Sequence, residues 1–135
     1  MLTKSDKNIV DILNSLPKTH KVIDVGGAGA PCKRANYILD AINYEEIGWD
    51  LAKGAGEPQF TKETFIKTDI CDRKPWPFKD KEFDYSVCTH TLEDLRDPLW
   101  VCSELIRISK AGFIEVPSKL YETCFNLEIK DLAGA

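Results

Sequence analysis

Hydrophobic and polar residues form blocks along the chain that predict helices and strands in turn. Residues 5–16 repeat apolar side chains at helical spacing, and Pro17 ends this first helix. Short apolar runs predict five strands, at residues 20–25, 45–50, 64–68, 84–89 and 113–116. Helical spacing also marks residues 31–42 and 97–109. This alternation predicts an α/β, Rossmann-like fold with a mainly parallel sheet of about five strands flanked by helices.

The last predicted helix has a clear start and a predicted buried face. Asp97 can cap the first free amides, and Pro98 suits the first turn. Ala111-Gly112 is interpreted as the turn into the fifth strand. The side chains expected to face the sheet are Leu99, Cys102, Leu105 and Ile106.

Residues 21–31 carry the most informative signal. Asp24 lies in the last part of a buried strand, and a loop of small residues, Gly26–Ala30, follows it. Small residues let the backbone approach a ligand closely. A helix at residues 31–42 would point its first amides at whatever occupies the loop. Strand, loop and helix together predict a pocket for a nucleotide-type cofactor.

This loop and several later segments resemble the class I S-adenosylmethionine-dependent methyltransferases, in particular their small-molecule, type 11-like branch. The family's glycine loop corresponds here to Asp24, Gly26, Ala28 and Ala30. Further matching segments are residues 47–51, 65–70, 76–88, 91–95, 104–108 and 112–117. The resemblance covers residues 21–118, and it implies the methyltransferase fold, S-adenosylmethionine as cofactor and a small-molecule methyl acceptor.

The resemblance also implies which residues bind the cofactor. Asp50 would accept hydrogen bonds from the ribose hydroxyls, and Asp69 would lie near the adenine amino group, with Asp72 as an alternative. Two of the family's three glycines are alanines here, at Ala28 and Ala30, and a methyl group at either would crowd the ligand or oppose a positive φ. The complete implied set is Asp24, Gly26, Gly27, Ala28, Gly29, Asp50, Leu51, Asp69, Ile70 and Thr89.

Methyl transfer from a sulfonium requires alignment and desolvation more than a protein nucleophile. A base is required only when the acceptor must lose a proton. His90 is the candidate because its ordinary pKa lies near neutrality, although it could equally be a polar residue that lines the pocket or faces solvent.

Composition describes one globular domain, residues 1–135 with a core at 20–118. Hydrophobic residues make up 43% and charged residues 30%, and the net charge of -4 argues against nonspecific binding of nucleic acid or acidic membranes. Five cysteines without a Cys-x-x-Cys pair predict reduced thiols, a cytoplasmic location and no structural zinc. No apolar run is long enough for a membrane span, and no signal peptide is recognised.

The C-terminal part is short for this family, whose sheet ends in a further hairpin beside the fifth strand. Residues 119–135 suffice for one helix or a tail, so the fifth strand is predicted to be an exposed edge that favours self-association. Two alternatives therefore stay open: a catalytically silent methyltransferase-like module or fragment, and a dinucleotide-binding Rossmann domain. The second lacks the required glycine spacing, because Cys32 stands where the third small residue belongs.

Overall fold

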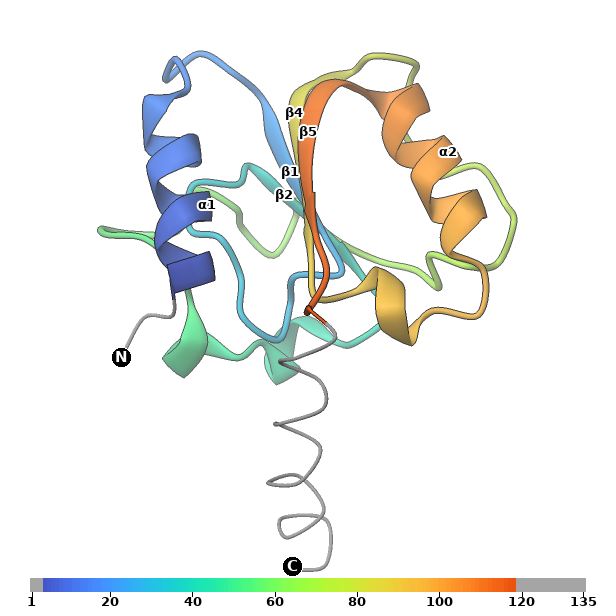
Figure 1. Cartoon of the computed structure of the whole chain (residues 1–135), viewed down its shortest axis with the longest axis horizontal. Helices are drawn as coiled ribbons and strands as arrows, with labels where there is room; N and C mark the ends of the chain where they lie inside the picture. The colour runs from blue at the N-terminus through green and yellow to red at the C-terminus, as the bar shows by residue number, and fades with distance from the viewer. Residues whose placement is uncertain (1–3, 119–135) are drawn as a thin grey trace, which may run out of the picture.

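The computed structural model describes residues 4–118 and contains one sheet of five parallel strands in the order β3-β2-β1-β4-β5. The strands are β1 (Val22–Val25), β2 (Tyr37–Asp40), β3 (Phe65–Lys67), β4 (Phe83–Thr89) and β5 (Ser109–Glu115). Helices α1 (Lys4–Ser15) and α2 (Pro98–Ile108) lie on opposite sides of the sheet (Figure 1). The predicted Rossmann-like α/β fold is confirmed.

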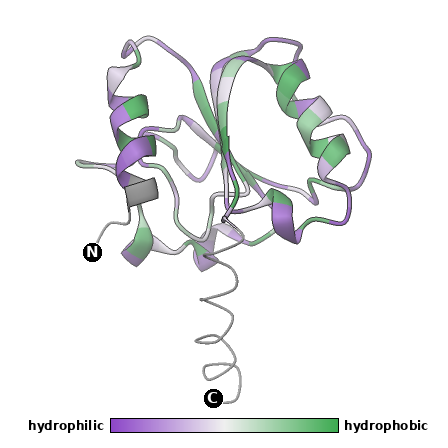
Figure 2. Ribbon diagram, in the orientation of Figure 1, coloured by the Kyte–Doolittle hydropathy of each residue, from purple (hydrophilic) through white to green (hydrophobic). Residues whose placement is uncertain are grey.

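Each face of the sheet buries its own hydrophobic cluster. Ile9 and Leu13 of α1 pack with Val22, Ile38 and Val87 on one face. The cluster on the α2 side of the sheet includes Ile23, Leu39, Phe83, Val101 and Leu105. Successive strand residues point to opposite faces, so neighbours such as Val22 and Ile23 serve different clusters. Hydrophobic segments accordingly converge on the sheet, while most connecting loops are hydrophilic (Figure 2).

The helix predicted at residues 31–42 is wrong, because this segment contains strand β2. The apolar side chains at 38, 41 and 42 imitate helical spacing, but Tyr37–Asp40 pairs with β1 on one side and β3 on the other. Asn36 fixes the entry into the strand: its side-chain oxygen accepts a hydrogen bond from the Val22 amide at 2.8 Å, and its own amide donates to the Val22 carbonyl. β1 and β2 are therefore joined by an irregular loop.

The strand predicted at residues 45–50 is also wrong. The segment forms two short 3-10 helices, η1 (Tyr44–Glu46) and η2 (Trp49–Leu51). Ile47 and Phe60, on either side of η2, are buried in the α1-side cluster. Residues 47–60 therefore contribute to covering the same face of the sheet as α1.

Helix α2 begins where the sequence predicts, with Asp97 accepting a hydrogen bond from the Trp100 amide at 3.1 Å, but its buried face differs. Leu99 and Ile106 are 81% and 70% exposed, and Cys102 is half-buried. The buried side chains are Val101, Glu104, Leu105 and Ile108. Glu104 can occupy this face because it accepts hydrogen bonds from Arg107 and from the Trp76 amide.

Strand β5 starts directly after α2, so Ala111 and Gly112 are strand residues and not a turn. A Cβ on Gly112 would approach the Ser86 hydroxyl oxygen to 2.5 Å. The close packing of β4 and β5 therefore leaves no room for a side chain at position 112. Among residues 4–118, no strand pairs with the outer side of β5. The predictions for residues 119–135 lie outside the described part of the chain. Within that part, every helix is too short or too polar to cross a membrane.

Candidate functional site

The carboxyl ends of β1 and β4 meet at the point where strand order reverses, which is where open α/β sheets bind ligands. The loop after β1 starts at Gly26, whose φ of 73° requires a residue without a side chain. Thr91, just beyond β4, donates from its hydroxyl to the carbonyls of Gly26 and Thr89 at 3.2 and 3.0 Å. The structure thus brings together three parts of the predicted site: Asp24, the glycine loop and Thr89.

Asp24 lies underneath the glycine loop and is only 1% exposed. One carboxylate oxygen accepts a hydrogen bond from the Cys32 amide at 2.9 Å, while the other, Oδ1, is buried without a partner. Burial raises the pKa of Asp24 to about 6, against the smaller lowering effects of the Cys32 amide and the charge of Lys53. A Cβ on Gly27 would lie 2.1 Å from this carboxylate, so glycine there lets the loop cross directly over it.

The outer side of the loop is open. No atom lies within 4 Å of the position that a Cβ on Gly29 would occupy. Ala28 and Ala30 do not have positive φ, because the positive-φ residues other than glycine in the described chain are Arg73, Lys81 and His90. The two alanines therefore introduce none of the backbone strain that their departure from the family pattern suggested.

Asp40 occupies the acidic position at the carboxyl end of the second strand. Its Oδ2 accepts a hydrogen bond from the Ala28 amide at 2.9 Å, and its Oδ1 accepts one from the Ala41 amide at 2.6 Å. Asp50 and Leu51 are instead exposed on η2. The prediction for Asp50 depended on a strand at residues 45–50, so its structural basis is lost. The run Tyr37–Asp40, apolar residues closed by an acid, was the sequence signal for the acid at the end of the second strand.

Asp69 and Ile70 follow β3, as predicted. The exposed Asp69 carboxylate pairs with Arg96 at 2.9 Å and accepts the Cys71 amide, and these hydrogen bonds lower its pKa. Ile70 is buried. The alternative acid, Asp72, pairs with Lys74 at the surface.

His90 follows the last residue of β4 and has an unusual backbone conformation, with φ of 51°. Its Nε2 lies 3.0 Å from a carboxylate oxygen of Glu115, and its Nδ1 lies 3.9 Å from Glu93. The side chain is 40% exposed and lies next to Thr89, at the carboxyl end of β4.

Lys53, which sequence reasoning did not identify, also lies at this site. Its side chain is among the buried charged groups, at 8% exposure, and its Nζ donates to the Thr89 hydroxyl at 3.3 Å. A lysine in a glycine-containing loop ordinarily indicates a solvated surface, and only the folded path of the chain brings it to β4.

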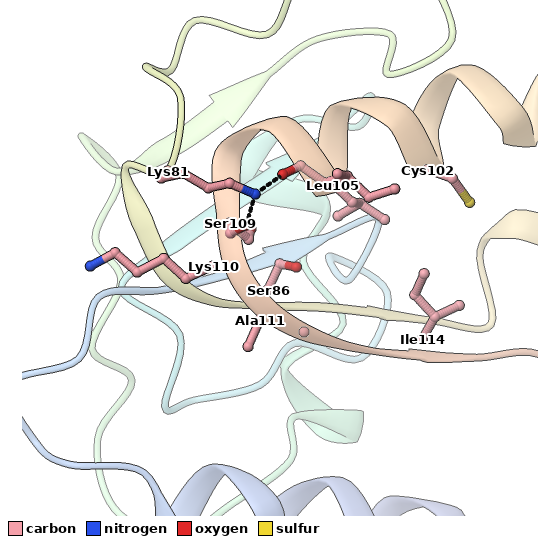
Figure 3. A pocket seen from close by; sticks show the side chains of 10 residues that line it. Lys81, Ser86, Cys102, Leu105, Ser109, Lys110, Ala111 and Ile114 are labelled. Carbon is pink, nitrogen blue, oxygen red and sulfur yellow. Dashed lines mark hydrogen bonds between the residues drawn. The ribbon is translucent and has the colours of Figure 1, made fainter.

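A separate hollow lies between α2 and β5, far along the chain from the glycine loop (Figure 3). At one end, Lys81 donates to the carbonyls of Ile106 and Ser109. Cys102, Leu105 and Ile114 are among the other residues that line it. None of the residues around this hollow belongs to the predicted cofactor site.

The rim of β1, β2 and β4 suits a nucleoside carrying an amino-acid group. It combines an open small-residue loop at Gly29, the acid Asp40 at a strand end, and a buried carboxylate oxygen of Asp24 without a partner. Carboxylates of this kind bind ribose hydroxyls or ammonium groups. The residues present therefore fit S-adenosylmethionine.

Comparisons with known proteins agree with this fold. Residues 6–127 match the family model of "Methionine biosynthesis protein MetW". A structure from Bacillus halodurans C-125, provisionally described as a methyltransferase, is similar with a TM-score of 0.59 and 18% identity, covering 91% of this chain and 57% of that chain. An S-adenosylmethionine-dependent methyltransferase from Thermotoga maritima gives a TM-score of 0.48 and 17% identity, covering 76% and 45%.

This chain thus spans 57% of the length of the Bacillus structure and 45% of the Thermotoga structure. A search of curated protein sequences finds no match.

Proposed function

The chain belongs to the MetW family, within the class I methyltransferases, and from this we propose that it binds S-adenosylmethionine and transfers the methyl group to a small-molecule acceptor. The observation that carries the proposal is the arrangement between β1 and β4, where the strand order reverses. The open loop after β1, Asp40 and the end of β4 lie there along one edge of the sheet. The family and the fold supply the class of cofactor. The acceptor is proposed from the type 11-like resemblance alone.

In this proposal each part of the rim has a separate task. Asp40, half-buried at the end of β2, accepts hydrogen bonds from the ribose hydroxyls through Oδ2, which has a second lone pair beyond the one used by the Ala28 amide, whereas Oδ1 is occupied by the Ala41 and Ile42 amides. The loop at Gly29 admits the ligand close to the backbone. Asp69 and Ile70 border the adenine. The bound cofactor supplies an activated methyl group, and the protein aligns and desolvates it.

His90 is the proposed general base for those methyl-accepting substrates that must lose a proton. When its Nε2 carries the proton and donates to Glu115, Nδ1 is left to accept a proton from the acceptor. Glu115 thereby orients the ring. For an acceptor that reacts without losing a proton first, His90 has no such task.

Isothermal titration with S-adenosylmethionine and S-adenosylhomocysteine tests the proposal. Binding in the micromolar range is expected, with a loss of about tenfold or more in Asp40→Asn, which keeps the acceptor oxygen but removes the charge. Asp50→Asn is the matched control and should bind as the wild type does, since Asp50 is exposed on η2. Failure of the wild type to bind either compound would contradict the proposal, and binding of NAD instead would favour a dinucleotide-binding domain.

Mass-spectrometric detection of S-adenosylhomocysteine separates an enzyme from a silent module. Incubation with S-adenosylmethionine and a panel of small-molecule acceptors should release S-adenosylhomocysteine with at least one of them. Tight cofactor binding without turnover on any acceptor would support the catalytically silent module.

A further inference from the structure

The segment that carries Lys53 is held against the far end of the glycine loop by backbone contacts. The Lys53 amide donates to the Pro31 carbonyl at 2.8 Å, and the Lys33 amide donates to the Lys53 carbonyl at 2.9 Å. These bonds form an isolated parallel bridge between Cys32 and Lys53. A few residues earlier, the Gly48 amide donates to the Ala28 carbonyl at 2.9 Å. Residues 48–53 therefore lie along the loop, and the backbone of Lys53 is fixed in place.

From that position the Lys53 side chain extends inward toward the switch point. Its Nζ reaches the Thr89 hydroxyl at the end of β4, at 3.3 Å, and the residue is only 8% exposed. Its charge also acts on Asp24, at the end of β1, where it opposes the rise in pKa that burial causes. A buried ammonium and a buried carboxylate therefore stand at the joint between β1 and β4.

Burial of a lysine is costly unless its charge has partners. Stability alone would be served by an apolar side chain at this place, whereas a fixed cation beside an anion is suited to an amino-acid group, which carries both charges. S-adenosylmethionine ends in such a group. Its α-carboxylate is the one negative charge in the molecule, and ammonium is its natural counterion.

We propose that Lys53 binds the α-carboxylate of the cofactor's amino-acid group and so makes the site specific for ligands that carry this carboxylate. Thr89 orients the Lys53 ammonium through its hydroxyl. The inference rests on the proposed function, because it assigns one part of the same cofactor site.

The sharpest test compares S-adenosylmethionine with its decarboxylated analogue, which lacks only the carboxylate. Titration calorimetry should show that Lys53→Gln weakens S-adenosylmethionine binding about 10- to 100-fold and changes binding of the decarboxylated analogue less than about twofold. Lys53→Arg keeps the charge and should recover part of the lost affinity. Lys62→Gln is the matched control, because Lys62 is exposed and pairs with Glu45 at 2.7 Å, and it should change neither affinity.

Each outcome decides the matter. If Lys53→Gln loses the same affinity for both ligands, Lys53 only maintains the loop. If it loses affinity for neither, Lys53 does not contact the ligand. Either result overturns the inference and leaves the proposed cofactor site in place. Retained binding of the decarboxylated analogue also demonstrates that the variant is folded. If the wild type binds neither ligand, the proposed function fails and the inference fails with it.

Discussion

At the scale of single residues, Asp24 is a buried acid whose carboxylate supports the glycine loop. Its carboxylate is covered by Gly27 and holds the Cys32 amide at 2.9 Å. Burial opposes ionisation, so the pKa of Asp24 is raised from 3.8 to about 6. The folded protein therefore binds this proton more tightly than the unfolded chain does.

Replacing Asp24 with Asn should change how stability depends on pH. Because the folded pKa is the higher one, the Asp24 contribution to stability is greatest below about pH 4, falls as pH rises toward about 6 and then stays constant. Asp24→Asn lacks this loss, so the free energy of unfolding of the variant relative to wild type should rise by about 2 kcal/mol between about pH 4 and 7. Urea unfolding of both proteins across this range measures it. Parallel pH profiles would contradict the assigned pKa.

The residues that sequence reasoning placed correctly share one property: they adjoin strands whose apolar runs are unambiguous. Asp24 and Thr89 lie in β1 and β4, where every residue of β1 and the last four residues of β4 are buried. Asp40 and Lys53 were missed for a different reason. Both depend on where the chain goes between residues 31 and 60, and hydrophobic spacing does not specify that path.

At the scale of elements, the segment 47–53 and the glycine loop form one unit through very close backbone packing. A Cβ on Gly48 would lie 1.9 Å from the Gly29 carbonyl oxygen, a distance that no real Cβ atom tolerates. Neither partner can move cheaply, since Gly48 also donates its amide to the Ala28 carbonyl. Glycine at 48 is therefore explained by this contact.

Gly48→Ala should destabilise the fold by about 1–3 kcal/mol and weaken cofactor binding, because the methyl group would push the loop out of position. Gly29→Ala is the matched control on the other side of the contact. Its Cβ would meet nothing within 4 Å, so thermal unfolding should be close to that of wild type. Differential scanning fluorimetry compares the two variants, and a Gly48→Ala protein as stable as wild type would refute the close packing.

The elements themselves were predicted unevenly, and the reason is physical. Strands β1, β3 and β4 and the start of α2 follow from apolar runs and from the Asp97-Pro98 cap. β2 was assigned to a helix for two reasons: a crossover helix was expected after β1, and the side chains at 38, 41 and 42 match a helical face. Pairing on both edges of β2 decides its structure, and such long-range pairing is not visible in local spacing.

At the scale of the whole molecule, the α2–β5 side combines two features that promote association. β5 has no partner on its outer edge within residues 4–118, and the apolar side chains nearby are exposed: Leu99, Ile106, Ile114 and Val116. Figure 3 shows Leu105 of α2 and Ile114 of this edge strand, two of the residues that line the hollow. An edge of this kind presents free backbone donors and acceptors beside an apolar surface.

The protein should therefore self-associate through β5, pairing this edge with that of a second copy. Sedimentation velocity at increasing concentration should show growth from monomer to dimer. Ile114→Lys should shift the equilibrium toward monomer, because a lysine on an edge strand opposes pairing and would bring like charges together across the interface. Leu51→Lys provides the control, since Leu51 is 66% exposed on η2 and its replacement should leave association unchanged. A single monomeric species at every concentration would contradict pairing through β5, and equal effects of the two variants would locate the interface elsewhere.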